Sequence, residues 1–218
     1  MASDDAPPAR PARDPEATRR DILDAATAEF AEHGLSGARI DAIAARTRTT
    51  VRMIYYYFGS KEGLYRAAIE RAYGAMRAAE RELGLDALTP EGAVQRLVEF
   101  VFDYHEANQG FNRLVTIENI HRAEHLSRSS TIAAANATVI ETLSAILARG
   151  QADGVFRVDA DAVSVHLLIT AFPFFRVSNR HTLGLLFGRD PLDEGLRADQ
   201  RRMCVEAVLG YLRAGAGA

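Results

Sequence analysis

Residues 39 to 65 constrain the fold of this 218-residue chain more than any other part of it. Apolar residues recur there at helical spacing in two short runs, residues 40 to 47 and 51 to 57. A tight turn separates the runs, and Thr49 or Thr50 is a good N-cap for the second one. The pattern therefore predicts two short helices joined by a turn, a unit whose second helix fits the width of a DNA major groove.

The charge of this part of the chain differs from that of the whole. Residues 34 to 66 contain six basic and two acidic side chains, a formal charge of +4, whereas the complete chain carries −3. The positive field is therefore confined to one segment, as expected for a surface that contacts nucleic acid.

Bulk properties narrow the class of protein. The length suits one large or two small domains. We find no apolar run long enough to span a membrane and no signal peptide, and Cys204 is the single cysteine. We therefore expect a cytoplasmic protein without disulfides and with no membrane contact.

The rest of the chain has helical period almost throughout. Residues 1 to 15 carry four prolines and are expected to form a disordered arm; a solvated tail and an arm whose Arg10 and Arg13 enter a DNA minor groove both remain open. With no convincing strand and no repeat, the fold class is all-α. The further helices are expected from Glu16 to Gly34, from Ser60 to Leu83, after Thr89-Pro90, over 112 to 125, over 128 to 149, over 160 to 180 with a kink at Pro173, and over 198 to 213, with a loop over 181 to 196.

The helix expected over residues 160 to 180 is apolar on two faces. One stripe holds Val163, Leu167, Ala171 and Phe174, and the other holds Val165, Leu168, Phe172 and Phe175. A helix of this kind needs two partners, so we expect one face on its own domain and one across a two-fold interface. The final helix would share that interface through Val205, Val208, Leu209 and Leu212; a central helix buried in a monomer is the alternative.

Residues 18 to 82 resemble the TetR family of bacterial transcription regulators. The matching pieces are Ile22-Leu23-Asp24-Ala25-Ala26 with Phe30 and Gly34, then Ile43-Ala44, and then the run from Ile54 to Leu64. The resemblance implies an all-α homodimer that binds a palindromic double-stranded operator and releases it when a small molecule binds. It also implies a three-helix helix-turn-helix DNA-binding domain over residues 16 to 62 and a helical effector-binding and dimerisation domain over residues 63 to 218.

The turn departs from the family pattern. Family members usually have Ala-Gly-Val-Ser, and Thr47-Arg48-Thr49-Thr50 stands in its place, which indicates a slightly different turn with an added cation. The run from Arg52 to Lys61, with residues 114 to 119 and 176 to 179, is similar to a branch that regulates pyrimidine and nicotinate catabolism.

Side-chain chemistry on the second short helix indicates how DNA would be read. Arg52 is the best candidate for bidentate contact with guanine, and Val51 and Met53 offer apolar contact with a thymine methyl. By the family pattern Tyr55, Tyr57 and Lys61 meet phosphates while Tyr56 packs partly inward; a tyrosine cluster that only joins helices is the alternative. The further phosphate candidates are Arg39, Arg46, Arg48 and Thr50.

Aromatic and scattered polar residues on the later helices suggest an apolar pocket for an effector, aromatic or heterocyclic in character. Glu118 and Arg122 are one turn apart, so a helical salt bridge between them is an equal alternative. The ligand-binding candidates are Phe102, His105, Phe111, Arg113, Glu118, Asn119, Arg122, His166, Phe172, Phe175 and Asn179.

Other functions have less support. His121 and His125 have a spacing that metal sites use, but surface histidines often share it, so we expect no metal and no cofactor. The chain lacks a recognisable nucleophile arrangement or phosphate loop, which argues against an enzyme. The competing hypothesis is an all-α small-molecule carrier without DNA function, and the +4 segment argues against it.

Overall fold

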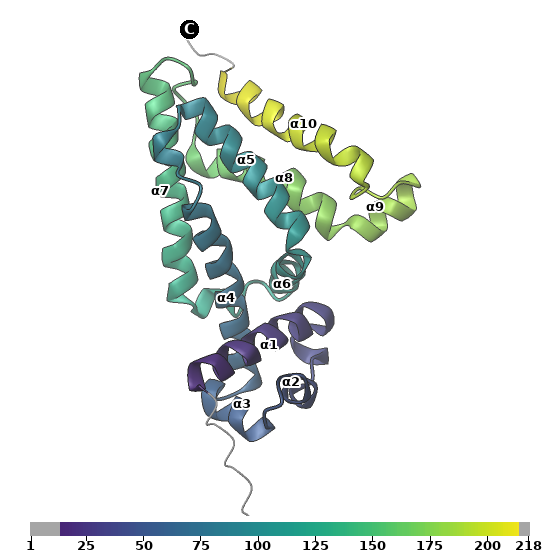
Figure 1. The fold of residues 1–218 in the computed structure, drawn as a ribbon. Coiled ribbons are helices and arrows are strands. Elements are labelled where there is room, and N and C mark those ends of the chain that lie inside the picture. The colour runs from purple at the N-terminus through teal and green to yellow at the C-terminus, as the bar shows by residue number, and fades with distance from the viewer. Residues whose placement is uncertain (1–13, 214–218) are drawn as a thin grey trace, which may run out of the picture.

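The computed structural model describes residues 14 to 213, and over this range the chain is helical with no strand (Figure 1). The arm expected over residues 1 to 15 lies almost entirely outside the described residues. The first four helices are α1 (Pro15–Gly37), α2 (Ile40–Thr47), α3 (Val51–Phe58) and α4 (Lys61–Arg81).

Local sequence signals set the ends of these helices. Gly34, at φ +66° and ψ 178°, breaks α1 near its end, where the sequence predicts a stop. The Thr50 hydroxyl accepts a hydrogen bond from the Met53 amide at 3.2 Å, and the Ser60 hydroxyl accepts one from the Gly63 amide at 3.0 Å. Both residues are therefore the N-caps that the sequence predicts for α3 and α4.

The second half of the chain forms the larger part of the molecule. After a 3-10 turn at Leu85–Ala87 come α5 (Pro90–Ala107) and α6 (Gln109–Ile120), and a second 3-10 turn lies at Leu126–Arg128. The remaining helices are α7 (Ser130–Ala152), α8 (Ala162–Ser178), α9 (Arg180–Phe187) and α10 (Glu194–Arg213).

Three expectations for this half were wrong or incomplete. The helix expected over residues 112 to 125 ends at Ile120, because Arg122 and Ala123 adopt positive φ. The loop expected over residues 181 to 196 contains α9. The α8 helix continues past Pro173 to Ser178, and a bend of 73° separates it from α9.

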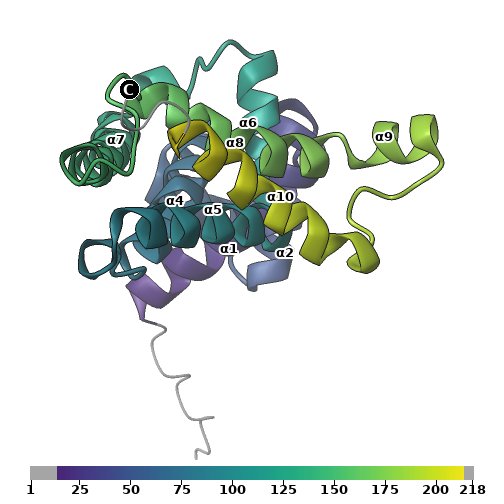
Figure 2. The same cartoon turned by 90° about the horizontal axis from the view of Figure 1, so that it is seen from above.

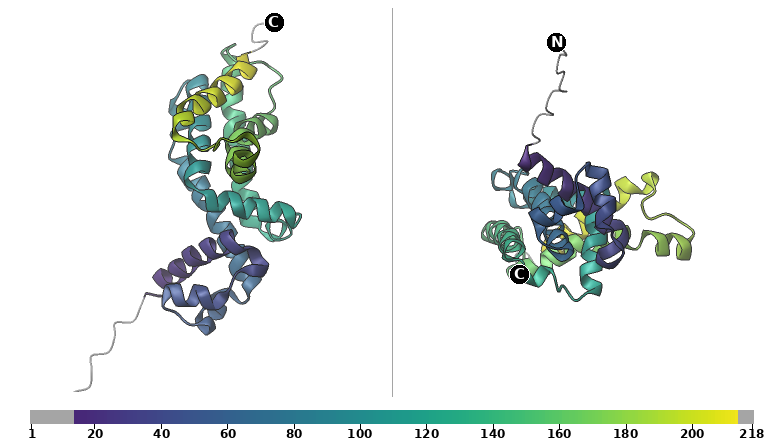
Figure 3. Two further views of the ribbon diagram at one scale, coloured as in Figure 1. Left: turned by 90° about the vertical axis from the view of Figure 1, so that its right-hand side faces the viewer. Right: turned by 90° about the horizontal axis from the view of Figure 1, so that it is seen from below.

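Two apolar clusters form the interior, and α4, α6 and α7 contribute residues to both. One cluster surrounds Ile22, Phe30 and Ile54 in the lobe of α1 to α3; the other surrounds Leu97, Phe102 and Val165 in the lobe of α5, α7, α8 and α10. Figure 3 shows the two lobes, with α4 running from one into the other. The α6 helix contributes to both clusters as well, through Leu114 in the first and Phe111 in the second.

The α8 helix presents apolar side chains to solvent within the described chain. Val163, Leu167 and Phe175 are 50, 63 and 54% exposed, so one of its faces lacks a partner in the protomer. The assignment for the final helix was wrong: Val208, Leu209 and Leu212 are buried in the protomer's own core and Val205 is half-buried. Figure 2 shows α9 projecting from the body, where Leu185, Leu186 and Phe187 are also exposed.

Length and composition alone would let α7 cross a membrane, and the bent pair of α8 and α9 passes the same test within the described residues. The buried side of α7 packs on α4, α5 and α8 through Val139, Leu143, Ile146 and Leu147.

Candidate DNA-binding surface and effector cavity

The turn between α2 and α3 is held in a left-handed conformation by a residue other than glycine. Arg48 has φ +52° and ψ +36°, and its amide donates to the carbonyl groups at the end of α2. Glycine is the residue that takes this conformation without strain. The arginine therefore places an exposed cation at the turn at a cost in backbone energy.

The orientation of α3 follows from one buried side chain. Ile54 is 1% exposed and lies on the side of α3 that packs on α2 and α4, so residues two positions away on either side face outward. Arg52 and Tyr56 are these residues; both are exposed, and they lie one turn apart. Val51 and Met53, each 37% exposed, and Tyr55, 42% exposed, lie beside them.

One interpretation of the tyrosines is corrected here. Tyr56, expected to pack partly inward, is 78% exposed, whereas Tyr57 is half-buried against the core of the first lobe. The Tyr56 and Tyr57 rings meet edge to face at 5.5 Å. Tyr56 therefore belongs to the outward surface beside Arg52, and Tyr57 contributes more to packing.

The candidate phosphate-binding cations differ in their present partners. Arg39 forms a bidentate pair with Asp41, at 3.2 and 2.6 Å. Arg46 lies 3.7 Å from Glu29, and the Lys61 ammonium donates to the Ser36 carbonyl at 3.3 Å. Arg39 and Arg46 are themselves exposed and Lys61 is partly exposed, although Glu29 is buried, so these side chains remain able to turn to a phosphate.

The second candidate site is a cavity of about 320 Å³ between α4, α5, α6, α7 and α8. Its apolar lining residues are Met76, Phe111, Val115, Val139, Ile140 and Phe174. Its polar lining residues are Tyr73, Arg77, His105, Asn136, His166 and Thr170. An apolar enclosure with a few fixed polar groups is the usual construction of a small-molecule site.

His105 is the most constrained polar group of this cavity. It is 2% exposed, and its Nδ1 lies 2.6 Å from Oδ1 of Asn112. Because the Asn112 amide nitrogen donates to the His105 and Asn108 carbonyls, Oδ1 is the acceptor and Nδ1 carries the proton. Burial, the largest influence, lowers the pKa of His105 to about 4, so the ring is neutral and Nε2 holds an unpaired acceptor.

Arg77 supplies the only fixed charge among the cavity's lining residues. Its side chain is 8% exposed and pairs with the buried Glu80, which does not line this cavity. The guanidinium Nε has no hydrogen-bond partner, and Nη2 contacts the sulfur of Met76 at 3.8 Å. Arg77 and Val139 also line a smaller cavity of about 150 Å³ beside the first one.

The structure brings together three of the sequence-predicted ligand residues, His105, Phe111 and His166. Sequence reasoning missed Tyr73, Arg77, Asn136 and Thr170, which are single polar residues on otherwise unremarked helix faces. The predicted candidates outside the lining are Phe102, Arg113, Glu118, Asn119, Arg122, Phe172, Phe175 and Asn179.

Glu118 has a structural role instead. Its carboxylate accepts hydrogen bonds from the His125 and Leu126 amides, each at 3.1 Å, and lies 3.0 Å from Nδ1 of His125. The Glu118 side chain is 1% exposed and pairs with His125. The alternative, a helical salt bridge with Arg122, was therefore wrong. Through these hydrogen bonds Glu118 holds in place the segment that follows α6.

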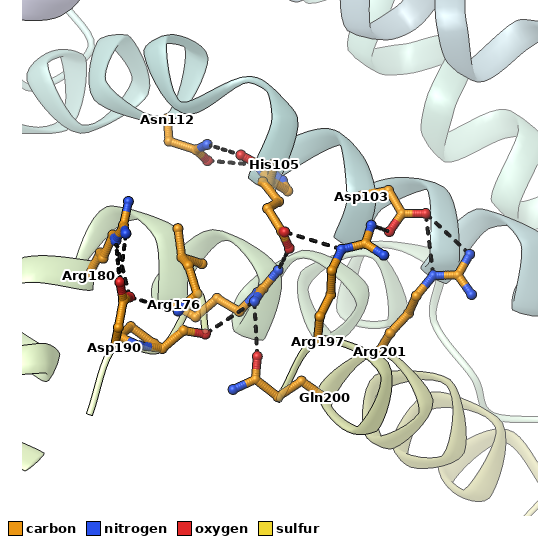
Figure 4. A network of polar contacts seen from close by, with 12 residues as sticks. Asp103, His105, Asn112, Arg176, Arg180, Asp190, Arg197, Gln200 and Arg201 are labelled. Atoms are coloured by element: carbon orange, nitrogen blue, oxygen red, sulfur yellow. Dashed lines mark hydrogen bonds and ion pairs between the residues drawn. The ribbon is translucent and has the colours of Figure 1, made fainter. Parts of the chain in front are cut away.

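A polar network joins α5, α8 and α10 (Figure 4). Arg176 of α8 is 1% exposed, pairs with Glu106 of α5, and donates to the side chain of Gln200 at 2.9 Å. Its guanidinium lies 3.9 Å from the Phe102 ring centroid, so Phe102 supports this arginine. Arg197 and Arg201 of α10 extend the network to Asp103.

Among residues 14 to 213, no group of three or more histidine, cysteine or acidic side chains is placed to hold a metal ion. His125 is occupied by Glu118, and His121 is exposed. The two histidines therefore have different surroundings in this structure.

An exposed helix-turn-helix, joined to a helical lobe that contains a partly open cavity, is the architecture of a DNA-binding regulator with room for a ligand. Comparison with known proteins agrees. Residues 22 to 68 match the family model described as bacterial regulatory proteins, tetR family, and residues 90 to 208 match the tetracyclin repressor-like C-terminal domain.

Individual relatives are similar over most or part of the chain. The chain is 36% identical to the HTH-type transcriptional repressor NicS of Pseudomonas putida over 196 residues, which cover 90% of this chain and 92% of that protein. It is 41% identical to the HTH-type transcriptional repressor SCO4008 of Streptomyces coelicolor over 109 residues, 50% of this chain and 53% of that one. The crystal structure of the putative regulator SCO4942 of Streptomyces coelicolor superimposes with a TM-score of 0.68 at 27% identity, covering 89% of this chain and 98% of that chain.

The chain therefore belongs to the TetR family, which confirms the resemblance and the all-α fold class inferred from the sequence. It is a DNA-binding transcriptional repressor regulated by an effector, and it is not an enzyme.

Proposed function

We propose that the protein is a cytoplasmic homodimer that places its two α3 helices in successive major grooves of a palindromic operator. The outward side of α3, with Arg52 and Tyr56 at its crest, is the observation that carries this proposal. Half-sites one helical turn apart would separate the two α3 helices by about 34–36 Å.

The unpartnered face of α8 supports the dimer. Val163, Leu167 and Phe175 stay exposed in the protomer although they are apolar, and contiguous exposure of this kind marks interaction sites. A two-fold axis through α8 would bury the same face of both copies.

We further propose that the functional boundary between the DNA-binding part and the effector part falls between residues 62 and 63, within α4. The α4 helix begins at the helix-turn-helix and reaches the cavity through Tyr73 and Arg77. The α6 helix gives a second connection, because Phe111 and Val115 line the cavity while Leu114 packs in the first lobe. A ligand that prefers one arrangement of these two helices would shift the spacing of the α3 pair.

The test is an anisotropy titration of the purified protein against DNA from upstream of its own coding region, at several salt concentrations, with light scattering on the same sample. We expect a dimer whose affinity falls steeply with salt and exceeds its affinity for scrambled DNA. A monomer, or equal affinity for both DNAs, would refute the proposal. An aromatic or heterocyclic effector, proposed from the cavity's lining, should weaken operator binding in the same assay.

A further inference from the structure

The effector cavity contains two polar groups whose hydrogen-bonding capacity is unused. One is Nε2 of His105, and the other is Nε of Arg77. Buried polar groups in native proteins nearly always have a partner, so two such nitrogens on residues that line one cavity point to a missing ligand.

The histidine specifies one feature of that ligand. Asn112 holds the proton of His105 on Nδ1, which leaves a lone pair on Nε2. A neutral nitrogen of this kind can only accept, so its partner must bring a hydroxyl or N–H donor. The low pKa of His105, about 4 because of burial, keeps the ring in this form at neutral pH.

The arginine specifies a second feature. The lining residues include one permanent cation, Arg77, and no carboxylate, since Glu80 lies outside the lining. The charge of Arg77 is partly balanced by Glu80 through Nη1, and the Nε donor remains unused. An anionic group on the ligand would use that donor, whereas a cationic ligand would be repelled by Arg77 and would find no carboxylate.

The walls set the shape. Phe111 and Phe174 stand beside the His105 ring, with centroids 5.9 and 5.7 Å from it. The volume of about 320 Å³ lies at the lower end of the range for ligand pockets. Aromatic walls at this size favour a small planar ring.

We propose that the effector is a small planar monoanionic acid that also carries a hydroxyl or ring N–H donor. Its carboxylate lies against Arg77, and Nε2 of His105 accepts from its donor. This assignment rests on the proposed effector role of the cavity.

The first experiment uses the unmodified protein and a matched set of probes in calorimetric titrations. The set is the three hydroxybenzoate isomers, their methyl ethers and the corresponding hydroxybenzamides. We expect at least one hydroxybenzoate to bind, and its methyl ether and amide each to bind at least about tenfold more weakly, because each lacks one partner for a buried group.

Three results would overturn the proposal. Equal binding of the ether removes the role of His105, and equal binding of the amide removes that of Arg77. If no isomer binds while a cationic or purely apolar compound does, or if nothing in the set binds at all, the ligand class is wrong.

Variants give a second, independent test. His105→Phe should abolish the preference for the hydroxyl over the ether, and the double change Arg77→Met with Glu80→Gln should abolish the preference for the acid over the amide without leaving a buried carboxylate unpaired. Because His105→Phe also removes the partner of Asn112, the nitrogen resonance of Nε2 is followed in the unmodified protein by NMR. It should move on addition of the hydroxybenzoate and stay in place with the ether; an unmoved resonance would contradict the proposed hydrogen bond.

Operator binding separates this inference from the proposed function. If the protein binds its operator but ignores the whole probe set, the ligand class fails and the DNA-binding function stands. If hydroxybenzoate binds as expected but operator affinity is unchanged, the cavity chemistry stands and its effector role fails.

Discussion

The surface of α3 and the effector cavity in the larger lobe hold their polar groups in opposite surroundings. On α3, Arg52 and Tyr56 lie in water, where their hydrogen bonds are satisfied by solvent until DNA replaces it. In the cavity, His105 and Arg77 are buried with donor or acceptor capacity left over. The first site therefore acts through charge and spacing, whereas the second depends on the chemistry of one ligand.

This difference indicates how ligand binding in the cavity would act on the DNA-facing surface of α3. Groups buried without partners carry a desolvation cost, so a ligand that satisfies them gains differential affinity for the arrangement it fits. The α4 and α6 helices contribute to both apolar clusters, so under the proposed function a change in their packing would displace α3. Phosphate contacts need correct spacing rather than correct local chemistry, so they are the contacts that such a displacement breaks.

The largest effect is expected at Arg52, the residue of the exposed α3 surface that we propose reads the bases. Arg52→Ala should cost about 1–3 kcal/mol of operator binding per half-site and relax sequence preference, because a bidentate contact with guanine is lost. Anisotropy titrations with operator variants measure both. Arg52→Lys should keep the salt dependence and still lose preference, since an ammonium lacks the planar fork.

Arg96→Ala is the matched control for this change. Arg96 is an exposed arginine of α5, in the other lobe. Its removal should leave preference intact. Unchanged operator affinity in Arg52→Ala would show that α3 does not read bases through this side chain.

The buried His105 of the cavity should make the free energy of unfolding depend on pH. The pKa of His105 is lowered by burial to about 4, below the value of about 6.5 in an unfolded chain. The unfolded state therefore takes up a proton between pH 6.5 and 4 that the folded state refuses, and stability is lost as pH falls through that window. We expect this group to remove about 2 kcal/mol of unfolding free energy between pH 7 and pH 5.

Denaturant unfolding of the unmodified protein and of His105→Phe measures this difference. The variant should be less stable at pH 7 and show a shallower pH dependence. His181→Gln, which changes an exposed histidine of α9, serves as the control and should keep the full dependence. Parallel pH profiles for the unmodified protein and His105→Phe would exclude a neutral buried ring at this position.

The helix-turn-helix was accessible from sequence because its signals are local. Thr50 and Ser60 cap the helices that follow them, and the spacing of Ile40, Ile43 and Ile54 fixes their inner faces. The orientation of Tyr56 was predicted wrongly because the family pattern was preferred to the helical period. Tyr56 lies two positions from the buried Ile54, so it has to face outward.

The cavity and the interface were less accessible because their geometry is not local. Glu118 binds His125 across a turn formed by positive φ at Arg122 and Ala123, which no spacing rule indicates. Arg77 lines the cavity only because α4 packs beside α7 in the tertiary fold. The sequence did not predict α9, because its apolar residues bury no face in the protomer; these are Leu185, Leu186 and Phe187.

A smaller effect is expected at the turn, where strain and charge can be separated. Arg48→Gly should raise the free energy of unfolding by about 1 kcal/mol, since glycine adopts φ +52° without a steric cost. The same change should weaken DNA binding by removing a cation. Arg48→Ala removes the cation but keeps the strain, so thermal unfolding should distinguish the two variants while salt titrations on DNA should not. Equal stability of the glycine and alanine variants would mean that the turn carries no strain.

The smallest effect is expected at Lys61, where the exposed surface meets the packing of the first lobe. Its ammonium donates to the Ser36 carbonyl at 3.3 Å, a contact that an exposed side chain gives up at little cost. If Lys61 turns to a phosphate, Lys61→Ala should weaken binding to all sequences alike and reduce the slope of log affinity against log salt by about one per half-site. If its role is only to join α4 to the end of α1, the variant should unfold at a lower temperature with an unchanged salt slope. Measuring both quantities on one sample decides whether this lysine belongs to the DNA-facing surface or to the scaffold beneath it.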